Sequence, residues 1–337
     1  MSEQYLLSVQ DLHTSFRTDS GEVQAVNGVS FNLNPGEILG IVGESGSGKS
    51  VTAYSVMQIL ADNGSIKSGH ILYKGEDLTT WSEKQMSHFR GKCCSIVFQD
   101  PMTSLNPVFT IGNQLGEAIR LHTNRKGKEV RDRAIEMLEL VGINEPEKRI
   151  KQYPFELSGG MRQRVMIAMA LACEPDILIA DEPTTALDVT VQAQVLELLK
   201  ELQRDMDTAI LLITHNLGVV WEMCDKVMVM YAGNTVEFTD TKTLYSNPRH
   251  PYTWGLLDSM PKLSDESKGE LKTIPGTPPD LRLTGKCCNF YNRCPYVTEA
   301  CTQSVPPLVE VEPGHFVACH RQNLTNKLEK GEGLKDE

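Results

Sequence analysis

The sequence lacks any long apolar run. No stretch approaches the roughly 18 apolar residues that read as a membrane span, and the longest ones, such as Val165–Cys173, have the size of core segments. The first residues, MSEQYLLSVQDLH, contain neither a basic region nor a long apolar stretch, so they do not resemble a signal peptide. We therefore expect a reducing, cytosolic compartment, in which disulfides are disfavoured.

Positive charge is also scarce. The 337 residues include 33 lysines and arginines against 44 aspartates and glutamates, a formal net charge of −11. Such an acidic chain is a poor candidate for nonspecific binding of nucleic acid or anionic lipid. Hydrophobic residues make up 40% and charged residues 23%, which excludes collagen-like, low-complexity and wholly disordered classes. The length indicates about two domains.

Short apolar runs alternate with longer mixed segments, which is typical of α/β proteins. Runs without polar alternation favour parallel strands that are covered on both faces. Between the runs Ile177–Ala180 and Ala209–Ile213, the sequence predicts a helix with Asp188 as its N-cap and an apolar stripe from Val191 to Leu202. The predicted strands are Ile38–Val42, Ile177–Ala180, Ala209–Ile213 and Val227–Tyr231.

Two regions depart from this alternation. Residues 100–165 carry no strong strand signal and include a charged amphipathic helix at Val130–Val141, so we expect a helical subdomain there. From Pro248 onward lie ten of the seventeen prolines, which predict a loop-rich segment that is compact only with a cross-link or a host surface. The predicted domains are residues 1–247, an extension at 248–325 and a solvated tail at 326–337.

The octapeptide GESGSGKS follows the strand Ile38–Val42, precedes a helical segment at Val51–Leu60, and matches the pattern G-x-x-x-x-G-K-[ST]. Its glycines let backbone N–H groups wrap around phosphates, Lys49 reaches the β- and γ-phosphates, and Ser50 supplies a magnesium ligand. An ordinary strand–turn–helix junction is the alternative. The predicted nucleotide contacts are Gly43, Glu44, Ser45, Gly46, Ser47, Gly48, Lys49, Ser50 and Val51.

Polar residues also follow two other predicted strands. Asp181 and Glu182 end the run ILIADE, where Asp181 can hold Mg²⁺ through water and Glu182 can act on an attacking water as general base. His215 ends the run AILLITH at the same ligand-binding edge of the sheet. The alternatives are an acidic loop and a structural histidine.

A third segment, LSGGMRQR, leads into a helix. Ser158 is a good N-cap, and the two following glycines leave the helix N-terminus open, which predicts a second anion site. By itself, the SGG triplet is also common in ordinary loops.

These motifs occur together in one order: GESGSGKS, Gln99, LSGGMRQR, ILIADEP, Ala186-Leu187-Asp188 and His215. The set resembles the nucleotide-binding subunit of ABC transporters over about residues 5–235. The resemblance implies a P-loop NTPase fold, a mostly parallel sheet core with a helical subdomain, and hydrolysis of ATP with Mg²⁺.

The same resemblance implies a pair of subunits arranged head to tail. Ser158, Gly159 and Gly160 would then contact the partner's ATP, and Asp188 would lie at the dimer seam. Phe16 would stack on adenine, with an ordinary core phenylalanine as the alternative.

Within each subunit, the resemblance implies that Ser50, Gln99 and Asp181 serve the Mg²⁺ ion and that Gln99 also links to membrane subunits. Glu182 would be the general base, and His215 would sense the γ-phosphate. The sequence departs from the usual family pattern at two positions. The signature reads LSGGM where LSGGQ is commoner, and Asn216 stands where aspartate is usual. Neither departure removes a group assigned to phosphate or water chemistry.

Longer matches narrow the resemblance. QDPMTSLNP (Gln99–Pro107) and PRHPYTWGLL (Pro248–Leu257) resemble the oligopeptide/dipeptide/nickel importer branch and extend the likeness to about residue 322. Within the branch, the likeness is closest to the first of the two ATPases of oligopeptide permeases. The alternatives are dipeptide or nickel import, a non-transport ABC ATPase and a noncatalytic regulator.

This branch implies the partners. They are a sister ABC ATPase in a heterodimer, two transmembrane permease subunits and, indirectly, a peptide-binding protein. The chain would be peripheral, at the cytoplasmic face of the bacterial cell membrane.

Cysteine is concentrated near the C-terminal end. Cys288, Cys294, Cys301 and Cys319 lie in the proline-rich extension, where four thiolates would suit a tetrahedral Zn²⁺ or an iron–sulfur cluster. The wide spacing suits a bulkier cluster, and the resemblance implies [4Fe–4S], with Zn²⁺ and free thiols as alternatives. Cys287 competes with Cys288 as the ligand. The cysteines expected as small core residues are Cys93, Cys94, Cys173 and Cys224.

Overall fold

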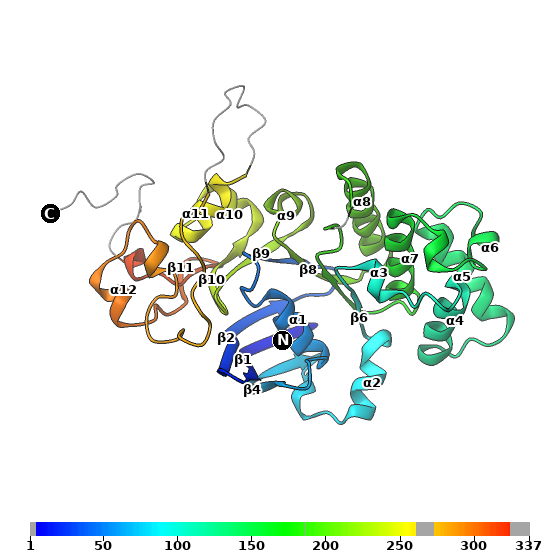
Figure 1. The fold of residues 1–337 in the computed structure, drawn as a ribbon, viewed down its shortest axis with the longest axis horizontal. Coiled ribbons are helices and arrows are strands. Elements are labelled where there is room, and N and C mark those ends of the chain that lie inside the picture. Colours follow the sequence, from blue (N-terminus) through cyan, green and yellow to red (C-terminus); the bar gives the residue numbers. More distant parts are fainter. Residues whose placement is uncertain (1–4, 186, 261–272, 324–337) are drawn as a thin grey trace, which may run out of the picture. The chain divides into compact units, whose positions relative to one another are not determined.

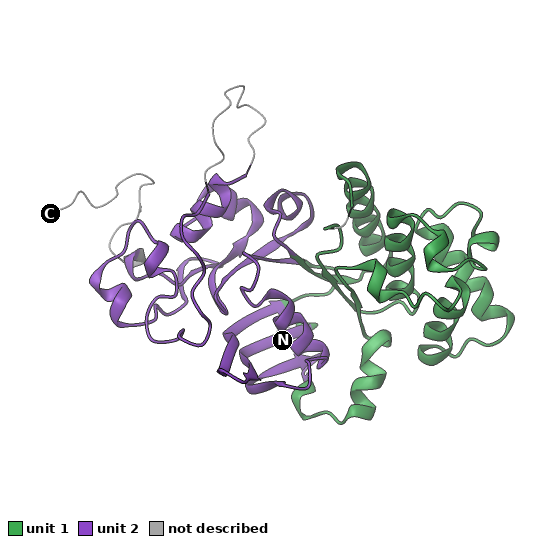
Figure 2. Cartoon of the chain, in the orientation of Figure 1, with its two compact units in different colours: residues 1–6, 33–38, 77–213 green, residues 7–32, 39–76, 214–337 purple. Residues whose placement is uncertain are grey.

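The computed structural model describes residues 5–185, 187–260 and 273–323 (Figure 1). The predicted tail at 326–337 and Ala186 lie outside the described residues. The chain divides into two compact units (Figure 2). Unit 1 consists of residues 1–6, 33–38 and 77–213, and unit 2 of residues 7–32, 39–76 and 214–337.

Unit 1 contains three parallel strands, β6 (Cys94–Val97), β7 (Ile177–Asp181) and β8 (Ala209–Thr214). Strand β7 pairs with β6 on one side and β8 on the other. Every residue of β7 and β8 is buried, which explains why their sequences are apolar without alternation. The two strands predicted here are therefore confirmed, with β7 one residue longer, so that it includes Asp181.

Helices fill the rest of unit 1, and no strand lies between Val97 and Ile177. The predicted helix after residue 188 is confirmed as α8. Asp188 is its N-cap, since Asp188 Oδ1 accepts a hydrogen bond from the Val191 N–H at 3.0 Å. The helices are α2 (Glu83–Lys92), α3 (Pro101–Ser104), α4 (Ile111–His122), α5 (Lys128–Leu140), α6 (Pro146–Arg149), α7 (Gly159–Leu171) and α8 (Val189–Met206), with short 3₁₀ turns at Leu78–Thr80 and Pro154–Glu156.

Unit 2 begins with an antiparallel sheet that sequence reasoning missed. Strand β1 (Leu7–Thr18) lies between β2 (Gly21–Leu33) and β4 (Gly64–Tyr73), and the two-residue β5 (Glu76–Asp77) follows β4 in the chain. The β1–β4 register runs from Leu7 opposite Tyr73 to Phe16 opposite Gly64.

The second sheet portion of unit 2 carries the predicted strands β3 (Ile38–Val42) and β9 (Lys226–Tyr231), which pair in parallel. Strand β9 turns back into the antiparallel β10 (Asn234–Asp240). Strand β12 (His315–Val317) pairs with β10, and β11 (Val309–Glu312) pairs with β12. The proline-rich extension therefore adds two strands to the sheet, next to β10.

The helices of unit 2 are short, and none of the helices in the described part of the chain is long and apolar enough to cross a membrane. They are α1 (Lys49–Met57), α9 (Leu217–Met223), α10 (Thr241–Ser246), α11 (Pro251–Asp258) and α12 (Glu299–Gln303), with 3₁₀ turns at Tyr291–Arg293 and His320–Asn323.

A buried carboxylate fastens the extension to β10. Glu237 is 0% exposed and accepts hydrogen bonds from the backbone N–H groups of Arg249 (2.7 Å) and His250 (3.0 Å). Its Oε1 also lies 2.8 Å from His315 Nε2 on β12. One side chain thus holds the start of the extension and its last strand together.

Replacing Glu237 with alanine leaves these buried donors without an acceptor. We expect Glu237→Ala to lower the free energy of unfolding by about 3 kcal/mol, measured by urea denaturation. The control is Glu139→Ala at an exposed position of α5, which should change it by less than about 0.5 kcal/mol. Equal stability of the two variants would show that Glu237 does not hold the extension.

Candidate functional site

The loop between β3 and α1 approaches neighbouring backbone so closely that two positions admit only glycine. A Cβ atom on Gly43 would lie 2.2 Å from the Met230 carbonyl oxygen, and one on Gly48 would lie 2.4 Å from that of Ala25. Both residues have positive φ, 153° and 100°. The loop is therefore held against β2 and β9 of its own unit.

Lys49 begins α1 and folds back over the loop. Its Nζ donates to the carbonyl oxygens of Gly43 (2.8 Å) and Glu44 (2.9 Å), and the residue is buried. Ser47 is also buried, and its Oγ has no hydrogen-bond partner. A buried ammonium, an orphaned hydroxyl and the N-terminus of α1 together fit a phosphate-bearing ligand.

In unit 1, the carboxyl ends of β6 and β7 bring Gln99 and Glu182 together. Gln99 Nε2 donates to Glu182 Oε2 at 2.9 Å, and Thr185 Oγ1 donates to the same oxygen at 2.8 Å. Asp181, the residue before, is buried at the end of β7. Sequence reasoning named Gln99 and Glu182 but did not predict their contact.

The backbone at Glu182 is in the left-handed region, with φ 47°. A non-glycine residue there carries strain of order 1–3 kcal/mol. The Glu182 N–H donates to the Ile213 carbonyl on β8 at 2.9 Å, so the neighbouring strand holds this conformation. The strained turn sends the carboxylate toward Gln99 and Thr185.

The SGG segment begins α7 as predicted. Ser158 caps the helix, because its Oγ accepts a hydrogen bond from the Met161 N–H at 3.3 Å. A Cβ on Gly159 would meet nothing within 4 Å, whereas one on Gly160 would lie 2.8 Å from Val191 Cγ1. The first turn of α7 is thus open to solvent at Ser158 and Gly159.

Three other predicted residues lie at exposed or half-exposed positions. Asp188 is exposed at the start of α8, and His215 is exposed directly after β8. Asn216 caps α9 by accepting from the Gly218 N–H at 2.9 Å, a role that aspartate fills equally well. Phe16 is half-buried, with its ring against Gly64 of β4. Its contact with adenine stays a prediction.

Ser50 belongs to unit 2, whereas Gln99 and Asp181 belong to unit 1. The predicted Mg²⁺ site that joins them therefore stays a prediction.

The predicted iron–sulfur cluster is wrong. Among residues 5–185, 187–260 and 273–323, no group of three or more histidine, cysteine, aspartate or glutamate side chains could hold a metal ion. Burial raises the pKa of Cys288 to about 12 and that of Cys294 to about 11, with the neighbouring thiols adding to the effect.

The extension owes its compactness to the host surface instead. Strand β12 pairs with β10, Glu237 binds His315, and Arg249 forms an ion pair with Glu312 of β11.

The other four cysteines match their prediction in part. Cys94 and Cys224 are buried, and desolvation raises the pKa of both thiols. Cys93 and Cys173 are only half-buried, and Cys173 Sγ donates to the Ala118 carbonyl at 3.5 Å.

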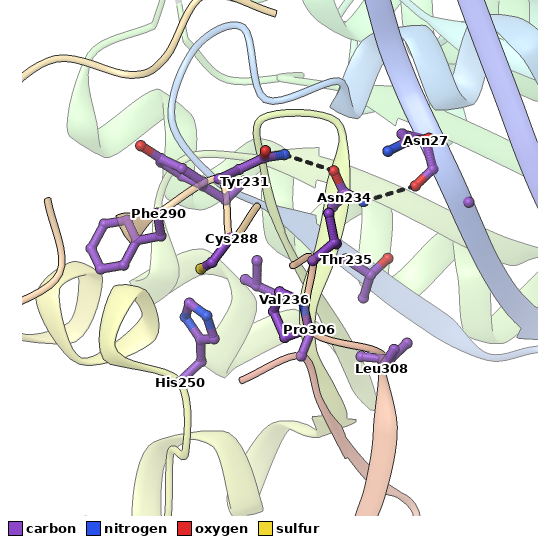
Figure 3. Close-up of a pocket in the computed structure, with 14 residues that line it drawn as sticks. Asn27, Tyr231, Asn234, Thr235, Val236, His250, Cys288, Phe290, Pro306 and Leu308 are labelled. Carbon is purple, nitrogen blue, oxygen red and sulfur yellow. Dashed lines mark hydrogen bonds between the residues drawn. The ribbon is translucent and has the colours of Figure 1, made fainter. Parts of the chain in front are cut away.

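A cavity of about 180 Å³ lies inside unit 2, and Figure 3 shows the residues that line it. Asn27 and Asn234 line one side and are joined by a hydrogen bond from Asn234 Nδ2 to the Asn27 carbonyl at 3.0 Å. His250, Cys288 and Phe290 line the other side. The Asn234 side chain is thus engaged in tying β10 to the backbone of β2.

Sequence reasoning missed two contacts of the loop between β3 and α1. Arg293 of the extension pairs with the Glu44 carboxylate, and the Tyr252 hydroxyl accepts from the Glu44 N–H. The motif PYTWGLL contained Tyr252, but no sequence signal links either residue to Glu44.

Comparison with protein families gives two matches. Residues 26–185 match the ABC transporter family, and residues 236–301 match the C-terminal region of oligopeptide/dipeptide transporters. The first contains the loop, the SGG segment and Glu182, and the second covers most of the extension.

Similar curated proteins span nearly the whole chain. The oligopeptide transport ATP-binding protein OppD of Bacillus subtilis is 53% identical over 93% of this chain and 87% of its own. The dipeptide transport ATP-binding protein DppD of the same organism is 53% identical over 94% and 95%. OppD of Escherichia coli is 51% identical over 94% and 93%.

Solved structures agree on the fold. The ATP-binding cassette MJ0796, described as a dimer bound to ADP and Pi, matches 70% of this chain and 98% of its own with 25% identity and a TM-score of 0.63. CbiO1 of Clostridium perfringens matches 73% and 92% with 30% identity and a TM-score of 0.62. The chain belongs to the oligopeptide/dipeptide family of ABC transporter ATP-binding proteins and has the ABC cassette fold.

Proposed function

We propose that this chain binds and hydrolyses ATP to energise the import of oligopeptides through an ABC transporter. The observation that carries the proposal is the pair of built sites at the ends of the parallel strands. One is the glycine-restricted loop with buried Lys49, and the other is the Gln99–Glu182–Thr185 network. Each site, taken by itself, suits one of the two tasks of an ATPase, which are phosphate binding and water activation.

Each residue then has a chemical task. Bound ATP supplies the phosphoanhydride bond, and Mg²⁺ neutralises its phosphate charge. Lys49 and the N–H groups of the loop orient the phosphates, while Glu182 accepts a proton from the attacking water. Gln99 fixes the Glu182 carboxylate. His215, which directly follows β8, would sense the γ-phosphate.

We infer that two ATPases work as a pair. The exposed Ser158 and Gly159 at the open end of α7 would contact the nucleotide of the sister subunit, and the exposed Asp188 would lie at the seam. The dimeric structure of MJ0796 supports such a pairing. Two permease subunits and a peptide-binding protein complete the proposed assembly, with this chain at the cytoplasmic face of the membrane.

Unit 1 offers an apolar surface for the permease. Arg162 connects two segments of this surface. The Arg162 Nε donates to the Pro154 carbonyl at 2.7 Å, and the Arg162 Nη1 contacts Met102 Sδ. We name this surface the apolar face; its exposed members are Phe98, Met102, Val108, Phe109, Tyr153 and Phe155. Exposed apolar residues gathered over adjacent segments are typical of protein interfaces.

Dipeptides are the second candidate substrate. The identity to DppD of Bacillus subtilis equals the identity to OppD of that organism, 53% in both cases. In this scheme, neither the loop nor the Glu182 network contacts the transported peptide. The choice between oligopeptides and dipeptides therefore depends on the partner proteins.

The first prediction from the proposed function concerns hydrolysis. Lys49→Ala should abolish ATP binding, because the loop loses its only buried ammonium among the described residues of the motif. Glu182→Gln should still bind ATP but lower kcat by at least about a hundredfold, since the general base is lost. Equilibrium ATP binding and phosphate release measure the two effects. Glu139→Gln on α5 is the matched control, and wild-type turnover in Glu182→Gln would contradict the assignment.

The second prediction concerns transport. A strain whose chromosomal copy carries Glu182→Gln should lose uptake of labelled tri- to pentapeptides, because closure and opening of the ATPase pair would stall. Uptake of a labelled dipeptide in the same strain separates the two substrate candidates. Intact uptake of both would exclude peptide import as the function of this site.

The third prediction concerns docking. Phe155→Asp places a charge on the apolar face at a residue that is 67% exposed, so it should reduce co-purification of the chain with the membrane fraction by about tenfold or more. ATP binding by the isolated chain should stay unchanged. Leu121→Asp, on the 71% exposed side chain of α4, is the control. Equal membrane recovery of both variants would remove the apolar face from the proposal.

A further inference from the structure

Glu44, the second residue of the phosphate-binding loop, is paired with the C-terminal extension. Arg293 Nη1 lies 2.6 Å from Glu44 Oε2, and Arg293 Nη2 lies 2.9 Å from Glu44 Oε1. The two residues are 249 positions apart in the sequence. Two parallel N–H···O bonds give this pair both strength and a fixed geometry.

The extension fixes the orientation of Arg293 completely. Besides Glu44, its Nη1 donates to Tyr231 Oη at 3.2 Å. Its Nη2 donates to the Ile274 carbonyl at 3.2 Å, and its Nε donates to the Pro275 carbonyl at 3.0 Å. The full donor set of the guanidinium is thereby used. The side chain is 4% exposed, so Arg293 is a rigid support for Glu44.

The backbone of Glu44 is held from both sides. Its N–H donates to Tyr252 Oη at 2.8 Å, and its carbonyl accepts from Lys49 Nζ at 2.9 Å and from the Ser47 N–H at 3.2 Å. Glu44 therefore connects residues of the extension directly with the lysine of the loop.

An aromatic cluster supports this connection. Tyr252 is fully buried, and its ring centroid lies 4.6 Å from that of Tyr231 and 5.4 Å from that of Phe290. The Arg293 guanidinium lies 5.7 Å from the Tyr231 centroid and 6.0 Å from the Phe290 centroid. Figure 3 shows Tyr231 and Phe290 side by side next to Cys288. The cluster leaves little freedom for either polar contact to Glu44.

The charge of Glu44 gives the pairing a functional consequence. A carboxylate in a phosphate-binding loop repels the anion that the loop receives. Arg293 neutralises that carboxylate at contact distance. Removal of Arg293 would leave the negative charge of Glu44 beside the phosphates.

We propose that Arg293 and Tyr252 are positioning residues of the ATP site: they hold Glu44, and through its carbonyl Lys49, and they cancel the negative charge of the loop. The extension is then a structural part of the nucleotide site. This inference rests on the proposed function of the loop as an ATP site.

The test measures equilibrium binding of Mg·ATP to the full-length chain, together with KM and kcat. Arg293→Ala should weaken ATP binding about tenfold and raise KM in proportion, with kcat at saturating ATP unchanged. Tyr252→Phe, which removes the acceptor of the Glu44 N–H, should weaken it about threefold. A purely structural role would lower the melting temperature without this split.

Charge removal provides the decisive arm. The double variant Arg293→Ala/Glu44→Gln should regain most of the lost affinity, since the unpaired negative charge is gone. ATP binding no tighter than in Arg293→Ala alone would overturn the charge argument. Arg293→Lys keeps the charge but loses the forked geometry, and we expect about threefold weaker binding. Should the alanine variant not fold, wild-type affinity in Arg293→Lys overturns the proposal.

Two controls separate this inference from the function beneath it. Arg282, in the same extension, pairs with Asp280, and Arg282→Ala should bind ATP as the wild type does. Lys49→Ala tests the loop itself. Lost ATP binding in Lys49→Ala with wild-type affinity in Arg293→Ala defeats only the positioning role. Wild-type affinity in Lys49→Ala defeats the proposed ATP site.

Discussion

Close backbone contact around the loop at Gly43–Ser50 is the constraint on which the rest of the site depends. The Met230 carbonyl leaves no room for a side chain on Gly43, and the Ala25 carbonyl leaves none on Gly48. Strands β2 and β9 thus set the path of the loop, and Lys49 folds back onto it because the carbonyls of Gly43 and Glu44 face its Nζ. The phosphate-binding geometry is consequently a property of the folded sheet rather than of the octapeptide.

The extension shows how a proline-rich segment becomes compact without a cross-link. Strand β12 continues the sheet from β10, and Glu237 satisfies three donors that would otherwise be buried without an acceptor. The metal prediction failed because the number and spacing of cysteines do not show how their side chains are arranged. Among the described residues, no group of three or more ligating side chains could hold a metal ion.

The sequence predicted the parallel strands β3, β7, β8 and β9 and the helix caps, because each depends on neighbours in the chain, but it missed the parallel strand β6. Strand β3 has the predicted bounds, and Asp188 and Ser158 cap the helices that follow them. The antiparallel sheet was missed because β1 and β2 mix buried and exposed residues irregularly, with register shifts between β1 and β4. Contacts such as Arg293–Glu44 were beyond reach, since nothing local marks a partner 249 residues away.

The two candidate sites share one physical feature, which is that hydrogen bonds from neighbouring residues fix the side chains of each site. Glu182 has a strained backbone with φ 47°, held by β8, and its Oε2 accepts from both Gln99 and Thr185. Glu44 is held by Arg293, Tyr252 and Lys49. Groups fixed in this way need no reorganisation during the reaction, because the free energy of folding has already offset the free-energy cost of ordering them. In the proposed ATP site, Arg293 would therefore change ATP affinity through Glu44 and would not need to touch the nucleotide.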